Sequence, residues 1–101
     1  MEARKRVKKM EDIFAHQLKL MKVLRELLAE VEASQVDFEK LLAYYQSQTY
    51  MADLSLEDEG HFNEMPRGVL SEDGVYNLLF DRDDMAEKLH QVGDLLQPSK
   101  K

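Results

Sequence analysis

Residues 7–45, VKKMEDIFAHQLKLMKVLRELLAEVEASQVDFEKLLAYY, repeat their apolar side chains with a seven-residue period. Ten of the twelve core positions of this heptad pattern are apolar, and the exceptions are Gln17 and Gln35. Such a period is typical of an amphipathic helix that packs against other helices. The stretch therefore predicts an all-α protein. One set of core positions is Val7, Phe14, Met21, Leu28, Gln35 and Leu42, and the other is Met10, Gln17, Leu24, Val31, Phe38 and Tyr45.

Further apolar residues on both sides of these positions make the stripe wide, as in a bundle helix that meets more than one neighbour. One helix through residue 48 would be roughly 65 Å long at 1.5 Å per residue, which is long for so small a domain. Ser34 followed by Asp37 can act as a helix cap. We expect a helix near 3–33, a bend or short break, and a second helix near 35–48, with one continuous helix as the alternative. The flanking residues are Ile13, Leu18, Leu20, Leu27 and Leu41.

Residues 48–70 show no long period, but they contain many large apolar side chains. Ser55, Asp58 and Gly60 indicate a short helical turn within them. We expect a partly ordered connection whose apolar side chains dock on the helices.

The last helix begins within RGVLSEDGVYNLL, residues 67–79. Ser71 is the expected N-cap, and the acidic residues that follow it suit the positive end of a helix. Leu70 can pack on Val75 as a hydrophobic staple, and Pro98 ends the pattern. The expected helix covers 71–96, so the chain as a whole predicts an antiparallel three-helix bundle that forms a single domain over residues 1–101.

The composition narrows the classes of function. The chain has no cysteine, which excludes disulfides, thiolate metal sites and cysteine nucleophiles. No apolar run is long enough to span a membrane, so we expect a cytoplasmic protein. The net charge of −6 makes general nucleic-acid binding unlikely, because it repels phosphate. Only the basic N-terminal end, residues 1–9, could contact nucleic acid.

Two groups of side chains are candidates for metal binding. The first is the acidic run Glu57, Asp58 and Glu59 with His61, and the second is the helical pair Glu87 and His90. The first group lacks the spacing of a calcium loop, and the second lacks the partner residues of a di-iron bundle. A solvated acidic face and a structural histidine are the simpler interpretations, so no metal or other cofactor is expected.

Four segments form a distinctive combination: Tyr44-Tyr45, the acidic residues 57–59, residues 67–73 (RGVLSED) and residues 75–79 (VYNLL). Together they resemble a family of short bacterial proteins of unknown function. The resemblance covers nearly the whole chain and implies a small, helical, cytosolic protein. It implies no activity, substrate or catalytic residue.

We expect a non-enzymatic helical module that binds other proteins and is able to self-associate. Arg67 and Tyr76 are the candidate partner contacts, because the sequence pattern gives neither of them a structural role. A small metal-dependent enzyme that uses residues 57–64 or the Glu87 and His90 pair is the alternative. Nucleic-acid contact through residues 1–9 is a second alternative.

Overall fold

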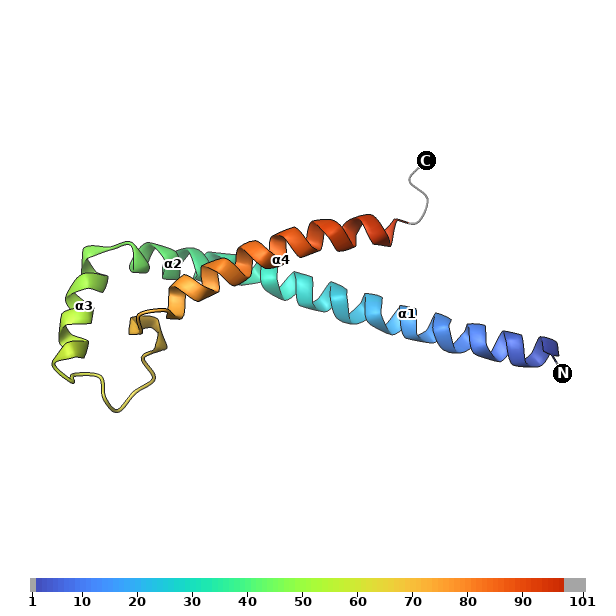
Figure 1. Cartoon of the computed structure of the whole chain (residues 1–101), viewed down its shortest axis with the longest axis horizontal. Coiled ribbons are helices and arrows are strands. Elements are labelled where there is room, and N and C mark those ends of the chain that lie inside the picture. Colours follow the sequence, from blue (N-terminus) through green and yellow to red (C-terminus); the bar gives the residue numbers. More distant parts are fainter. Residues whose placement is uncertain (1, 98–101) are drawn as a thin grey trace. The chain divides into compact units, whose positions relative to one another are not determined.

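The computed structural model describes residues 2–97, and every regular element in this range is helical (Figure 1). The prediction of an all-α protein with a long first helix is confirmed. Pro98, the predicted end of the last helix, lies outside the described residues. The elements are α1 (Glu2–Ala33), α2 (Gln35–Tyr45), α3 (Gln48–Asp58), the 3-10 helix η1 (Gly68–Leu70) and α4 (Gly74–Leu96).

Backbone contacts divide the chain into two compact units, residues 1–42 and 43–101. Unit 1 contains α1 and most of α2, and unit 2 contains the end of α2 with α3, η1 and α4. We describe each unit by itself. Residues 2–97 contain four α-helices where three were predicted, because residues 48–58 form α3. The single domain and the antiparallel packing of the helices remain predictions.

The break predicted at Ser34 is only one residue wide. The Ser34 N–H donates to the Glu30 carbonyl at 3.0 Å, and the Phe38 N–H donates to the Ser34 carbonyl at 3.0 Å, so helical hydrogen bonds continue through it. The Ser34 hydroxyl donates to the Val31 carbonyl at 2.9 Å instead of capping the next helix. The expected cap at Ser34 is therefore wrong, because its side chain bonds to the preceding turn.

The second helix ends at Tyr45, three residues before the predicted bound, because Ser47 turns the chain. The Ser47 N–H and hydroxyl both donate to the Tyr44 carbonyl, at 3.0 and 2.6 Å. The same hydroxyl accepts the Tyr50 N–H at 3.1 Å and so caps α3. Helix α3 thus fills the first half of the predicted 48–70 connection, and Ser55 lies inside it instead of capping it.

Helix α3 ends at Asp58, and Gly60 turns the chain just beyond it, as the sequence indicated. Gly60 has a φ of 84°, and its N–H donates to the Glu57 carbonyl at 2.9 Å. The His61 N–H donates to the Leu56 carbonyl at 3.1 Å. These two bonds form a Schellman motif, which favours glycine at the residue with positive φ.

The last helix begins at Gly74, three residues after the predicted start. Residues 68–70 form η1 instead, and the Ser71 hydroxyl donates to the Gly68 carbonyl at 2.7 Å. The predicted N-cap at Ser71 is wrong, because Asp73 is the residue that precedes the helix. The Ser71 hydroxyl still accepts the Gly74 N–H at 3.0 Å, so it binds a free amide at the helix entry. A Cβ at position 74 would collide with the Gly68 carbonyl and lie 2.7 Å from the Ser71 hydroxyl. This turn therefore requires glycine at position 74.

The buried residues of the described chain all lie in unit 2. Tyr50 on α3 is 8% exposed and Val75 on α4 is 4% exposed. Element η1 packs against both α3 and α4. Helix α1 has no buried residue despite its 32-residue length. The buried core thus lies in unit 2, whereas no side chain of the apolar stripe on α1 is buried.

Candidate functional site

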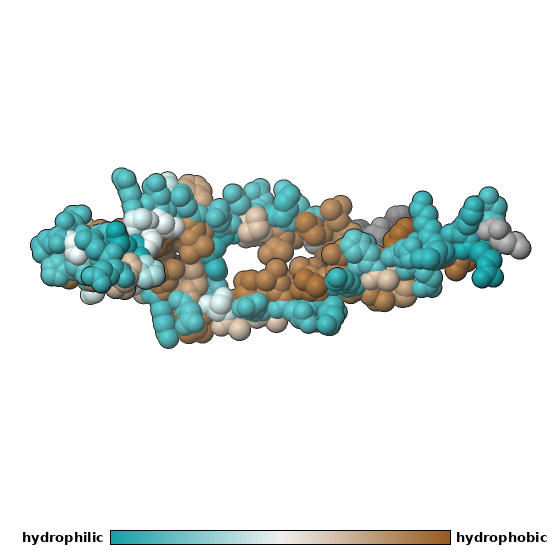
Figure 2. Space-filling model, turned by 90° about the horizontal axis from the view of Figure 1, so that it is seen from below, coloured by the Kyte–Doolittle hydropathy of each residue, from teal (hydrophilic) through white to brown (hydrophobic). Residues whose placement is uncertain are grey.

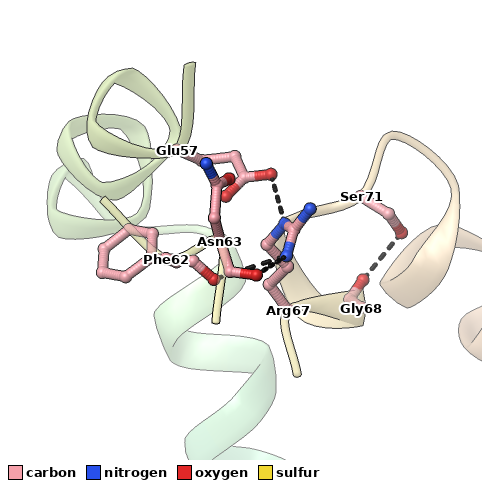
Figure 3. Close-up of polar contacts among 6 residues, drawn as sticks. All are labelled: Glu57, Phe62, Asn63, Arg67, Gly68 and Ser71. Atoms are coloured by element: carbon pink, nitrogen blue, oxygen red, sulfur yellow. Dashed lines mark hydrogen bonds and ion pairs between the residues drawn. The ribbon is translucent and has the colours of Figure 1, made fainter. Parts of the chain in front are cut away.

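Arg67 joins η1 to the end of α3 (Figure 3). Its Nε donates to Glu57 Oε2 at 2.8 Å, and this is also an ion pair. Its Nη1 donates to the Asn63 carbonyl at 3.2 Å and to the Phe62 carbonyl at 3.4 Å. One guanidinium thereby holds a helix end and the loop that follows it.

Arg67 therefore has the structural role that the sequence pattern did not reveal. Its guanidinium is used within unit 2, and both side chains of the ion pair are half-buried. The partner is ten residues away across an irregular loop, and no helical or strand spacing marks such a pair. Its use as a partner contact stays an untested prediction.

Glu57 presents its second carboxylate oxygen to the interior of the loop. Oε1 is buried and has no hydrogen-bond partner among the described residues. A buried carboxylate oxygen without a partner costs free energy, which the Arg67 ion pair offsets at Oε2. Removing Arg67 would leave both oxygens without a partner.

Tyr76, the other candidate contact, faces outward from the first turn of α4. It is 52% exposed and stacks edge-to-face on Phe80, with ring centroids 4.9 Å apart. Phe80 is 54% exposed. Two neighbouring exposed aromatic rings form a surface patch of the kind found at protein interfaces. Sequence inspection singled out Tyr76 but missed Phe80, one helical turn away on the same face.

The acidic residues proposed as metal ligands have different neighbours. Glu57 binds Arg67, while Glu59 Oε1 lies 3.2 Å from His61 Nε2. Asp58 is exposed at the end of α3. Within residues 2–97, no three carboxylate or histidine side chains come together as a possible metal site.

Glu87 and His90 lie on α4, and both are exposed. The expectation that His90 is a structural histidine at the edge of an apolar face stays a prediction. Glu87 and His90 share α4, whereas Glu57 lies on α3.

A cluster of three tyrosines at the start of unit 2 was missed by the sequence analysis. Tyr50 packs between Tyr44 and Tyr45, with ring centroids at 5.3 and 5.1 Å. The Tyr44 hydroxyl donates to Asp53 Oδ2 at 2.6 Å. This bond to the carboxylate, followed by burial, raises the pKa of Tyr44 to about 12. Part of the signal was available in the sequence, because Ser47 stands at N-cap spacing from Tyr50 and turns the chain between Tyr45 and Tyr50.

The largest exposed apolar surface of unit 1 follows the heptad stripe of α1. Nine of its large side chains are between 38% and 57% exposed. In the space-filling view, hydrophobic residues gather in patches between hydrophilic ones (Figure 2). Large exposed apolar patches are typical of interaction surfaces in stable proteins. The nine are Val7, Met10, Ile13, Phe14, Leu18, Leu20, Leu27, Leu28 and Val31.

The membrane prediction agrees with the structure. Across the helices of residues 2–97, none combines the length and the apolar character needed to cross a bilayer. The exposed stripe of α1 is interrupted by charged side chains on its flanks.

These features define an all-helical protein with one exposed amphipathic helix and a small unit held by polar ties. Residues 7–92 match the model of a domain of unknown function, DUF4298. The chain belongs to this family, which confirms the resemblance to an uncharacterised family. No curated protein and no solved structure gives a significant match.

Proposed function

We propose that this chain is a non-enzymatic interaction module of the bacterial cytoplasm, whose α1 stripe binds a helical protein partner and supports self-association. The observation that carries the proposal is the stripe itself. It exposes nine large apolar side chains on a helix with no buried residue. An isolated helix gains little stability in water, and most helical stability comes from covering an apolar face. A partner that covers α1 would supply that stability.

The chain's own helices are too short to cover the whole pattern. The heptad pattern runs over residues 7–45, through α1 and α2, whereas α4, the second-longest helix in the described chain, has 23 residues. A helix of that length reaches roughly 35 Å, against nearly 60 Å for the whole pattern, at 1.5 Å per residue. We expect a helix from another molecule to cover the remainder.

Sedimentation equilibrium of the full chain over a range of concentrations tests this proposal. We expect reversible self-association for the natural sequence and its loss on Phe14→Glu, because a carboxylate would then have to be buried in the seam. Ala15→Glu is the matched control, since the adjacent residue lies off the stripe. A monomer at every concentration, or equal effects of both substitutions, would contradict the proposal.

Tyr76 and Phe80 give the module a second surface, on α4. We expect Tyr76→Ala to reduce the binding of partner proteins with little change in stability. Arg67→Ala should act mainly on stability, because its guanidinium is used within unit 2. Comparing partner capture with thermal unfolding for the two variants separates these roles.

A further inference from the structure

One flank of the α1 stripe carries charges in a symmetric pattern. When their order is reversed, each positive charge stands opposite a negative one. If Val7 is a core position a of the heptad, the e positions fall every seven residues along one side of the helix. Residues of opposite charge then stand at equal distances on either side of Leu18. The e positions in order are Arg4, Glu11, Leu18, Arg25 and Glu32, all within the continuous helix α1.

The opposite flank is also symmetric between Arg6 and Ser34, and in that part it is apolar. Its g positions Ile13 and Leu27 stand at equal distances from Leu20. The core positions between the flanks are apolar except for Gln17. Apart from the pairs Gln17–Met21 and Arg6–Ser34, a helix of the same sequence that runs in the reverse direction along α1 would therefore meet matching side chains.

From this pattern we propose that the partner of the α1 stripe is a second copy of the chain, docked antiparallel about an axis between Leu18 and Leu20. In this register Arg4 faces Glu32 of the second copy, and Glu11 faces its Arg25. Twofold symmetry repeats each pair, which makes four ion pairs along the seam. In the core, Val7 lies against Val31 of the second copy and Phe14 against its Leu24. The inference rests on the proposed function and adds its partner and geometry.

A parallel pair fits the same residues poorly. It would place the two basic segments 1–9 side by side, each with five lysines and arginines against one glutamate. It would also bring Leu20 beside Arg25 of the second copy, and Leu27 beside its Glu32. The antiparallel arrangement instead lays the basic start of one helix along the end of the other, where Glu30 and Glu32 lie. Charge complementarity thus selects the antiparallel direction.

The ion pairs that α1 does form lie on its other face. Lys8 bonds to Asp12 at 2.8 Å, and Lys22 lies 3.7 Å from Glu26, with all four side chains exposed. By contrast, none of the four charged e positions has an ion pair within the described residues. These charges remain available to a second copy.

Charge reversal tests the register without disturbing the apolar core. We expect Arg25→Glu or Glu11→Arg alone to raise the dimer Kd about tenfold or more, because each replaces two attractive pairs by two repulsive ones. An equimolar mixture of the two variants, or the double variant, should restore the natural affinity. Lys19→Glu is the matched control, since Lys19 lies on the outer face and its reversal should leave Kd unchanged. Circular dichroism at high concentration checks that each variant remains helical.

Introduced cysteines test the direction independently, because the chain has none of its own. We expect a mixture of Val7→Cys and Val31→Cys to form a mixed disulfide dimer on oxidation, and Val7→Cys alone to form none. A dimer whose Val7→Cys variant bonds to itself would be parallel and would overturn this inference, while leaving self-association intact. A strict monomer, whose stripe is covered within the chain or only by a different protein, would overturn both self-association and the antiparallel dimer. A dimer that is indifferent to both charge reversals would also overturn the register.

Discussion

Unit 2 ties its helices together with side chains, whereas unit 1 offers a long helix and leaves its apolar stripe open. In residues 43–97, Ser47, Arg67 and Ser71 each bind the backbone or a carboxylate at a helix end. In α1, the ion pairs are exposed contacts between residues four apart, and no side chain is buried. We therefore expect unit 2 to supply its own order and, on the proposed function, unit 1 to depend on a partner for much of its stability.

The largest expected contrast in stability is between Gly74, which lies in a crowded turn, and Gly93, which has open space around it. Gly74→Ala should destabilise the chain by about 3 kcal/mol, because its Cβ would collide with backbone in the turn before α4. Gly93→Ala, within the same helix, meets nothing within 4 Å and should stabilise the chain by about 0.5–1 kcal/mol. Urea unfolding measures both. Equal effects of the two substitutions would show that the turn at Gly68–Ser71 does not constrain the helix entry.

The next largest contrast in stability is between the Arg67–Glu57 ion pair of unit 2 and the Lys8–Asp12 ion pair of unit 1. Arg67→Ala should cost about 2 kcal/mol, since it leaves the half-buried Glu57 carboxylate without its partner. Lys8→Ala removes an ion pair of the same length from the exposed surface of α1. It should change the free energy of unfolding by less than about 0.5 kcal/mol. A double-mutant cycle with Glu57→Gln isolates the Arg67 interaction, and a coupling near zero would contradict its structural role.

The tyrosine cluster gives unit 2 a specific dependence on pH. The pKa of Tyr44 lies at about 12 in the folded chain, above its ordinary value of 10.0. The neutral hydroxyl is thus favoured by folding, so this contribution is complete below pH 10 and is lost as the pH rises from about 10 to about 12. Tyr44→Phe should remove that part of the pH dependence and cost about 1 kcal/mol at neutral pH.

Urea unfolding at several pH values, with tyrosinate absorbance as a second signal, checks the Tyr44 prediction. Tyr76→Phe serves as the control, because Tyr76 contacts only Phe80 among the ring contacts of the described chain. Identical pH profiles for the natural sequence and Tyr44→Phe would contradict the assigned bond to Asp53.

Two serines should show the smallest contrast. Ser47→Ala removes the cap of α3 and should cost about 1 kcal/mol. Ser34→Ala removes a hydroxyl that bonds only to the preceding turn, so it should be neutral or stabilise by a few tenths of a kcal/mol. Thermal unfolding of the two variants measures the difference. A larger loss at Ser34 would mean that the junction of α1 and α2 needs its hydroxyl.

The sequence predicted the helices best where one physical signal acts along the chain. The seven-residue period identified residues 3–33 as a helix, and α1 covers Glu2–Ala33. Prediction from the sequence failed where a side chain could form either of two hydrogen bonds. Ser34 and Ser47 both resemble caps in the sequence, but only the Ser47 hydroxyl accepts an amide in the following helix.

The candidate site was less predictable, because its contacts cross irregular segments. Tyr76 could be singled out as an aromatic residue on a helix entry, and the structure places it on the surface. The Arg67–Glu57 pair depends on how the loop after Gly60 folds, which no sequence period specifies. The close approach at Gly74 likewise arises from the 3-10 turn of η1, which the cap pattern at Ser71 did not indicate.

Hydrogen exchange measured at two protein concentrations tests the central contrast most directly. We expect amides of residues 7–31 to become better protected as the concentration rises, because association covers the α1 stripe. Amides at the C-terminal end of α3, including those of Gly60 and His61, should be protected equally at both concentrations. Protection of α1 that is strong and independent of concentration would contradict the account, because its stability would then come from within the chain.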